Sequence, residues 1–138
     1  MRGREILAVV ATFKNAHFDL STDDEKRVVK LVRTGEPFHS VREMVAVLDD
    51  IFQAVAGLDS KEYGLLVDNR NGPARFDPSF QEAFKSFRLR LDERFVRVGV
   101  LLATEPGIKQ LEESGPSPNV RAYTDFDAAL RWAAEGLE

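Results

Sequence analysis

Hydrophobic and polar residues alternate along the chain in a pattern that predicts strands first and strand–helix units afterwards. Two mainly apolar segments near the start, residues 5–13 and 26–33, are typical of strands, and the polar segment 21–25 joins them. Strands connected by a short link usually lie next to each other in a sheet. We therefore expect these two strands to pair antiparallel.

A helix is predicted from Ser40 to about Ala56. Ser40 and Glu43 have the spacing of a capping box, in which each side chain satisfies a backbone N–H of the first turn. Gly57 is a typical stop signal. The apolar residues of the segment recur at helical spacing and predict a face packed on the sheet: Val41, Met44, Leu48, Ile51, Phe52 and Val55.

Three strand–helix units follow, and this alternation is typical of parallel strands joined by helical crossovers. The predicted units are residues 63–68 with 78–91, 95–103 with 105–114, and 120–123 with 125–134. Four residues of the first of these helices share one face and are predicted to lie in the core: Phe80, Phe84, Phe87 and Leu91. Thr124 and Asp127 have the spacing of a second box-like helix start. The fold class is α/β, with a mixed central sheet of about five strands, an antiparallel N-terminal pair and about four helices.

Composition supports one domain spanning residues 1–138, because the chain is 43% hydrophobic and 30% charged. No cysteine is present, which excludes disulfides and thiolate chemistry. The net charge of −4 disfavours nucleic acid as a partner. No apolar run approaches the length of a transmembrane helix, so we expect no membrane insertion and a cytoplasmic location.

Residues for catalysis are sparse, and we expect a protein that is not an enzyme and binds no cofactor or metal. His17 and His39 are the only imidazoles, lack the spacing of a metal-ligand pair, and are interpreted as surface residues. Gly72 stands outside any phosphate-binding glycine motif. The carboxylates of residues 23–25 lie in a predicted turn, a solvated place without the pocket that general acid–base chemistry needs.

Ser79 is the most informative residue of the chain. The apolar run from Tyr63 predicts a buried strand that ends at Asp68, and a loop then leads to Asp77-Pro78-Ser79. Asp77 suits the N-cap, Pro78 suits the first helical position, and the helix dipole stabilises an anion on Ser79 in the first turn. The same residues also make an ordinary helix start, in which Ser79 only solvates the terminus.

Two segments resemble the STAS domain family, the SpoIIAA-like fold of bacterial anti-sigma-factor antagonists and of the cytoplasmic tails of sulfate transporters. One is Asp77-Pro78-Ser79-Phe80, at the place where the antagonists carry an Asp-Ser-Ser-Gly helix start whose second Ser is phosphorylated. The other follows the apolar strand up to Ala103 and ends in the Ser-Gly pair of residues 114–115. The resemblance implies that Ser79 is a phosphoacceptor and that the partner is a kinase-type anti-sigma factor.

The favoured function is therefore regulatory protein binding at the loop and helix around Ser79, with Arg70, Arg75, Phe76 and Asp77 as contact residues. Five cations could steer an acidic partner: Lys85, Arg88, Arg90, Arg94 and Arg97. A small-molecule or lipid-binding module is the alternative, and a cavity next to the aromatic residues of the N-terminal half would favour it: Phe13, Phe18 and Phe38. A structural homodimer is a third possibility.

Overall fold

The computed structural model describes residues 13–58, 62–72, 77–113 and 117–137. The strands among them are β1 (Phe13–Lys14), β2 (Phe18–Asp23), β3 (Val28–Arg33), β4 (Gly64–Asp68), β5 (Val98–Leu101) and β6 (Val120–Tyr123). The helices among them are α2 (Val41–Val55), α3 (Pro78–Arg94), α4 (Glu105–Glu113) and α5 (Phe126–Glu135).

The strands form one mixed sheet in the order β1-β2-β3-β4-β5-β6. The pairs β1–β2 and β2–β3 are antiparallel, and β3 to β6 run parallel to one another. Strands β4, β5 and β6 are each reached through a helix, as expected for parallel neighbours. The predicted α/β class, with an antiparallel N-terminal part, is confirmed.

The N-terminal hairpin corrects one prediction. The strand beside β3 is β2, which includes part of the segment that the sequence analysis assigned to a polar link. Along β2, Phe18 and Leu20 are buried while Asp19 and Ser21 are exposed, which is the alternation of a half-buried strand. Phe13 pairs with Leu20 of β2 and not with β3. Residues 5–12 of the predicted first strand lie outside the described residues.

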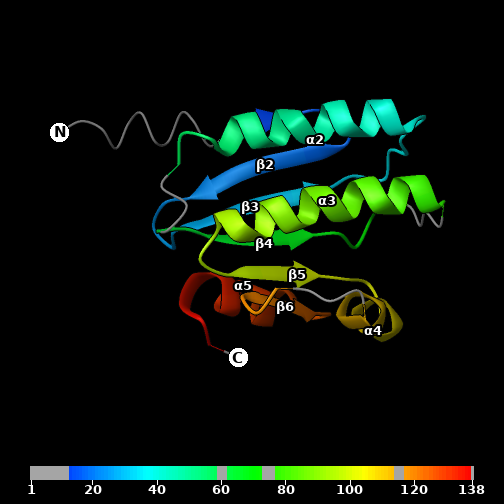
Figure 1. Cartoon of the computed structure of the whole chain (residues 1–138). Helices are drawn as coiled ribbons and strands as arrows, with labels where there is room; N and C mark the ends of the chain where they lie inside the picture. The colour runs from blue at the N-terminus through cyan, green and yellow to red at the C-terminus, as the bar shows by residue number, and fades with distance from the viewer. Residues whose placement is uncertain (1–12, 59–61, 73–76, 114–116, 138) are drawn as a thin grey trace.

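Helices cover the two faces of the sheet differently (Figure 1). Helices α2 and α3 lie side by side on one face, α5 lies on the other, and α4 lies beside β6. The main hydrophobic core fills the α2–α3 face, and the predicted stripe of α2 faces it. The second core is smaller and lies under α5; its buried residues are Val28, Leu66, Leu101, Ala129 and Ala133.

The aromatic face of α3 is only partly as predicted. Phe80, Phe87 and Leu91 are buried, but Phe84 is 36% exposed and belongs among the large hydrophobic residues on the surface. Its ring lies 6.3 Å from that of Phe87, at the margin of the core. Helical spacing predicts which side of a helix is apolar, but the depth of each position depends on the neighbouring elements.

The starts of two helices differ in how well they were predicted. At α2, Ser40 accepts a hydrogen bond from the Glu43 N–H (3.0 Å), and the Glu43 carboxylate accepts one from the His39 N–H (2.7 Å). The capping box is therefore confirmed, with its return bond one residue earlier than expected. At α5 the N-cap is Asp125, which accepts from the Ala128 N–H. The predicted box of Thr124 was wrong, since the Thr124 hydroxyl instead donates to Glu105.

Candidate functional site

One edge of the sheet carries three of the residues that the sequence analysis singled out, Arg70, Asp77 and Ser79. Strands β3 to β6 are parallel, so their carboxyl ends share an edge, and each of the four described helices begins there (right-hand side of Figure 1). Open α/β sheets generally bind ligands and partners outside the carboxyl ends of their strands. We call this side of the molecule the carboxyl edge.

Ser79 is exposed at the carboxyl edge, in the first turn of α3. Pro78 occupies the first helical position and Asp77 the N-cap, as predicted, but the Asp77 side chain makes no capping hydrogen bond. The backbone carbonyl of Asp77 accepts the first helical bond, from the Gln81 N–H (3.0 Å). The local sequence thus placed Ser79 correctly, although the cap is a backbone one.

The first turn of α3 differs from the others in its charge. Three of the four helices that the structure describes have an acidic residue in the first turn: Glu43 in α2, Glu105 in α4 and Asp127 in α5. The first turn of α3 has none. Acidic side chains normally offset the positive end of the helix dipole. At α3 the acidic residue at the helix start is the N-cap, Asp77, and the first turn itself carries Ser79.

Arg70 is held by its own strand end. Its guanidinium donates two hydrogen bonds to the Asp68 carboxylate, at 3.0 and 2.8 Å, and its backbone N–H donates a third. These bonds hold the pKa of Asp68 below its ordinary value, against the opposing effect of burial. Arg70 is thus oriented by Asp68 at the carboxyl edge. Arg75 and Phe76 fall outside the described residues.

A cluster of aromatic and cationic side chains lies at the end of β3, beside the loop that follows β4. The rings of His17 and Phe38 are stacked at 4.5 Å, and the Arg33 guanidinium carbon lies 4.5 Å from the centroid of Phe38 and 5.4 Å from that of Phe18. Arg33 also donates hydrogen bonds to the carbonyls of His17 and Thr34. Burial lowers the pKa of the Arg33 guanidinium, but the nearby carbonyls and rings solvate its charge.

This cluster corrects two expectations. His17 is buried, 7% exposed, and not a surface residue. The region of Phe18 and Phe38 is packed with side chains, with the two rings 3% and 6% exposed, where the small-molecule alternative expected a cavity. The signal that sequence reasoning missed was Arg33 at the end of an apolar strand, since a buried arginine needs carbonyls or rings around it.

The basic residues predicted to steer a partner are largely engaged inside the fold. Arg94 donates to the carbonyls of Val55 and Ala56 at the end of α2, at 3.4 and 3.2 Å. Arg97 donates to those of Trp132 and Ala134 at the end of α5, at 2.9 and 3.0 Å. Cations near helix C-termini hydrogen-bond the last carbonyls and interact favourably with the helix dipole. Arg90 lies over the Phe52 ring, so these cations act within the structure and do not form one docking patch.

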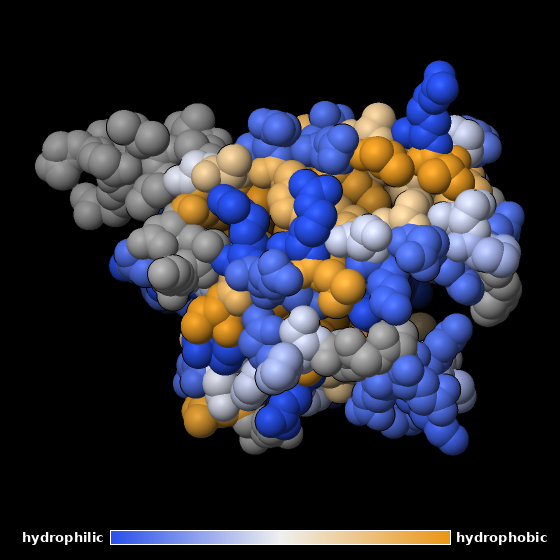
Figure 2. All heavy atoms as spheres, viewed as in Figure 1, coloured by the Kyte–Doolittle hydropathy of each residue, from blue (hydrophilic) through white to orange (hydrophobic). Residues whose placement is uncertain are grey.

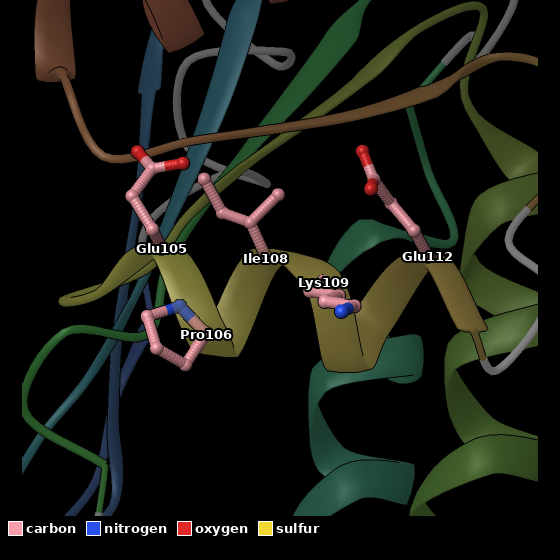
Figure 3. Close-up of a pocket in the computed structure, with 5 residues that line it drawn as sticks. All are labelled: Glu105, Pro106, Ile108, Lys109 and Glu112. Atoms are coloured by element: carbon pink, nitrogen blue, oxygen red, sulfur yellow. The ribbon is translucent and has the colours of Figure 1, made fainter.

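An open hollow lies along α4 (Figure 3). Five residues of that helix line it, and all but the half-buried Ile108 are exposed: Glu105, Pro106, Ile108, Lys109 and Glu112. Side chains from a single helix surface do not enclose a ligand. Figure 2 shows hydrophilic residues over α4, and hydrophobic ones gathered along α2 and its boundary with α3. Among the described residues, no group of three or more His, Asp or Glu side chains could hold a metal ion.

Comparison with solved structures places this architecture among known folds. The crystal structure of an uncharacterized DUF3478-family protein with a SpoIIAA-like fold, from Shewanella loihica PV-4, superposes with a TM-score of 0.60. The match covers 88% of this chain and 98% of that one, at 16% sequence identity. This chain has a SpoIIAA-like fold.

The SpoIIAA-like fold confirms the resemblance that the sequence suggested, at the level of architecture. No family model matches the sequence. No curated protein matches it either. The part of the chain that the structure describes holds no helix both long enough and apolar enough to cross a bilayer.

Proposed function

We propose that this protein is a regulatory binding domain that docks a protein partner at the carboxyl edge, and that phosphorylation of Ser79 controls the docking. The observation that carries the proposal is the first turn of α3, in which an exposed serine follows the N-cap Asp77 and no acidic residue stands within the turn itself. A phosphate there meets the positive end of the dipole, an interaction worth about 0.3–1 kcal/mol.

The proposal treats the protein as a binder and not as an enzyme. Two chemistry-bearing groups at the carboxyl edge have structural partners: Arg70 is bound to Asp68, and His17 is stacked on Phe38. The SpoIIAA-like fold supports a partner of the anti-sigma-factor kinase class, because that is the partner implied by the resemblance to the antagonists. The small-molecule alternative receives no support from the packed region around Phe18 and Phe38.

The test uses the anti-sigma-factor kinases encoded in the same genome as this chain. Each purified kinase is incubated with the chain and ATP, and the modified residue is located by mass spectrometry. We expect one phosphate, on Ser79, and none in Ser79→Ala. Binding is then measured by titration calorimetry, and Ser79→Glu is expected to change the Kd at least about tenfold, while Ser79→Ala binds like the wild type.

Ser86→Glu is the matched control, since Ser86 is also exposed on α3 but lies two turns further along. Both Glu variants are expected to melt like the wild type, because neither side chain is buried. Equal changes in Kd for Ser79→Glu and Ser86→Glu would show that general charge on α3 controls binding. Absence of binding and phosphorylation with every kinase would overturn the assignment of the partner.

A further inference from the structure

Asp92 is a buried carboxyl group near the C-terminal end of α3, at the opposite end of the helix from Ser79. Its residue surface is only 2% exposed, and its Oδ2 atom has no hydrogen-bond partner. A buried carboxylate oxygen without a donor is costly, because it loses the hydrogen bonds that water gave it in the unfolded chain. Asp92 is therefore an exception to the rule that buried polar groups are hydrogen-bonded, and packing alone does not explain it.

The backbone around Asp92 attaches α3 to the far end of the sheet. The Asn119 side-chain amide, just before β6, donates to the carbonyls of Asp92 and Phe95, both at 2.9 Å. Leu91 and Phe95, on either side of Asp92 in the chain, belong to the main core, as does Val120 next to Asn119. The carboxyl group thus lies at an apolar junction that holds the end of α3 on β6.

The charged groups that act on the Asp92 carboxyl lie on its own helix. Arg88, one turn earlier, favours the ionised form, and the adjacent Glu93 disfavours it. From the β6 side the described contact is the neutral amide of Asn119, which donates to the Asp92 backbone carbonyl, and the adjacent Val120 is an apolar core residue. Burial outweighs the effect of Arg88 and raises the pKa of Asp92 to about 6.

We propose that Asp92 is a protonation switch that controls how firmly the C-terminal end of α3 is held on the sheet. As a neutral acid it is accommodated among the apolar side chains. Once ionised it draws that end of the helix toward water and weakens the two bonds from Asn119. This switch is independent of the docking proposed at Ser79, since it acts at the other end of the helix.

The direction of the pH effect on stability follows from comparing the folded and unfolded states. The folded state holds the proton more tightly than the unfolded chain, so the Asp92 contribution to stability is present at low pH and is lost as pH rises from about 4 to about 6. Between pH 5 and pH 7.5 this group alone should lower the folding equilibrium constant about tenfold. Other titrating groups also change stability over this range, so the effect must be read as a difference between variants.

The experiment compares the wild type with Asp92→Asn and Glu93→Gln by urea unfolding at pH 5 and pH 7.5. Relative to the wild type, Asp92→Asn should be about tenfold better folded at pH 7.5 than at pH 5, whatever its absolute stability. Glu93→Gln removes a neighbouring charge that disfavours ionisation of Asp92, so it should lose less stability than the wild type between pH 5 and pH 7.5. If the difference between Asp92→Asn and the wild type does not change with pH, the switch does not exist.

Direct titration of the wild type keeps the test valid if Asp92→Asn folds poorly. The side-chain carboxyl carbon of Asp92, followed by NMR, should titrate well above an ordinary aspartate, and backbone amides near the end of α3 should exchange faster at pH 7.5 after correction for intrinsic rates. An Asp92 that titrates near 4 would overturn the proposal, as would protection of the helix end that is equal at both pH values.

Discussion

The two faces of the sheet are packed on different principles. On the α2–α3 face large side chains separate helices from strands, among them Phe18, Phe80 and Phe87. On the α5 face the helix backbone nearly touches the strands, because Ala129 and Ala133 lie over Gly99 and Gly64. Truncating a large side chain on the α2–α3 face leaves a cavity, whereas the contact between α5 and the sheet has no room for one added methyl group.

Gly64→Ala should have the largest effect of any substitution considered. A Cβ at this position would lie 1.8 Å from the Ala133 carbonyl oxygen and 2.7 Å from its carbon, so α5 would have to move off the sheet. We expect a loss of about 4 kcal/mol or more in the free energy of unfolding, measured by urea denaturation.

Gly99→Ala, where the Cβ would lie 2.6 Å from the Ala129 oxygen, should cost less but act in the same direction. Gly35→Ala is the control, since the nearest atom there is 3.8 Å away. If Gly64→Ala unfolds at the same urea concentration as Gly35→Ala, the α5 face is not closely packed in solution.

Phe87→Ala tests the other face. Phe87 is 6% exposed and makes an edge contact with Phe52 of α2 at 5.2 Å, so its removal leaves a cavity in the core. The expected cost is about 3–5 kcal/mol. Phe84→Ala, one turn earlier on α3, should cost only about 1 kcal/mol because Phe84 is partly in water. Thermal unfolding of both variants measures these losses of stability. Equal losses for Phe87→Ala and Phe84→Ala would mean that α3 is rotated relative to this structure.

Arg97→Met and Arg94→Met compare the helix ends on the two faces. Methionine keeps most of the apolar stem and removes the cation that binds the terminal carbonyls. Arg97→Met should cost about 1–2 kcal/mol, because both bonds to α5 are short. Arg94→Met should cost about 1 kcal/mol or less, since its bonds to α2 are longer. Chemical denaturation measures both, and a larger loss for Arg94→Met would reverse the ranking of the two helix ends.

Local patterns predicted the elements of this protein where one segment alone contains the information. The stripe of α2, its capping box and the run of strand β4 are periodic or contiguous in sequence, so burial and capping follow from spacing. The position of Ser79 in the first turn of α3 was predictable for the same reason, since Pro78 specifies the start of a helix. The pairing of β2 was missed although its alternation is present in the sequence, because its polar residues resemble a turn.

Only the tertiary structure decided which of these residues are partners. Arg33 meets His17, Arg97 meets the end of α5, and Gly64 meets Ala133, each across a long separation in sequence. Such contacts depend on how the sheet twists and how each helix crosses it, and no local pattern contains that geometry. The burial of Asp92 and the exposure of Phe84, on the same helix, were therefore set by what packs against α3 and not by the residues of α3 themselves.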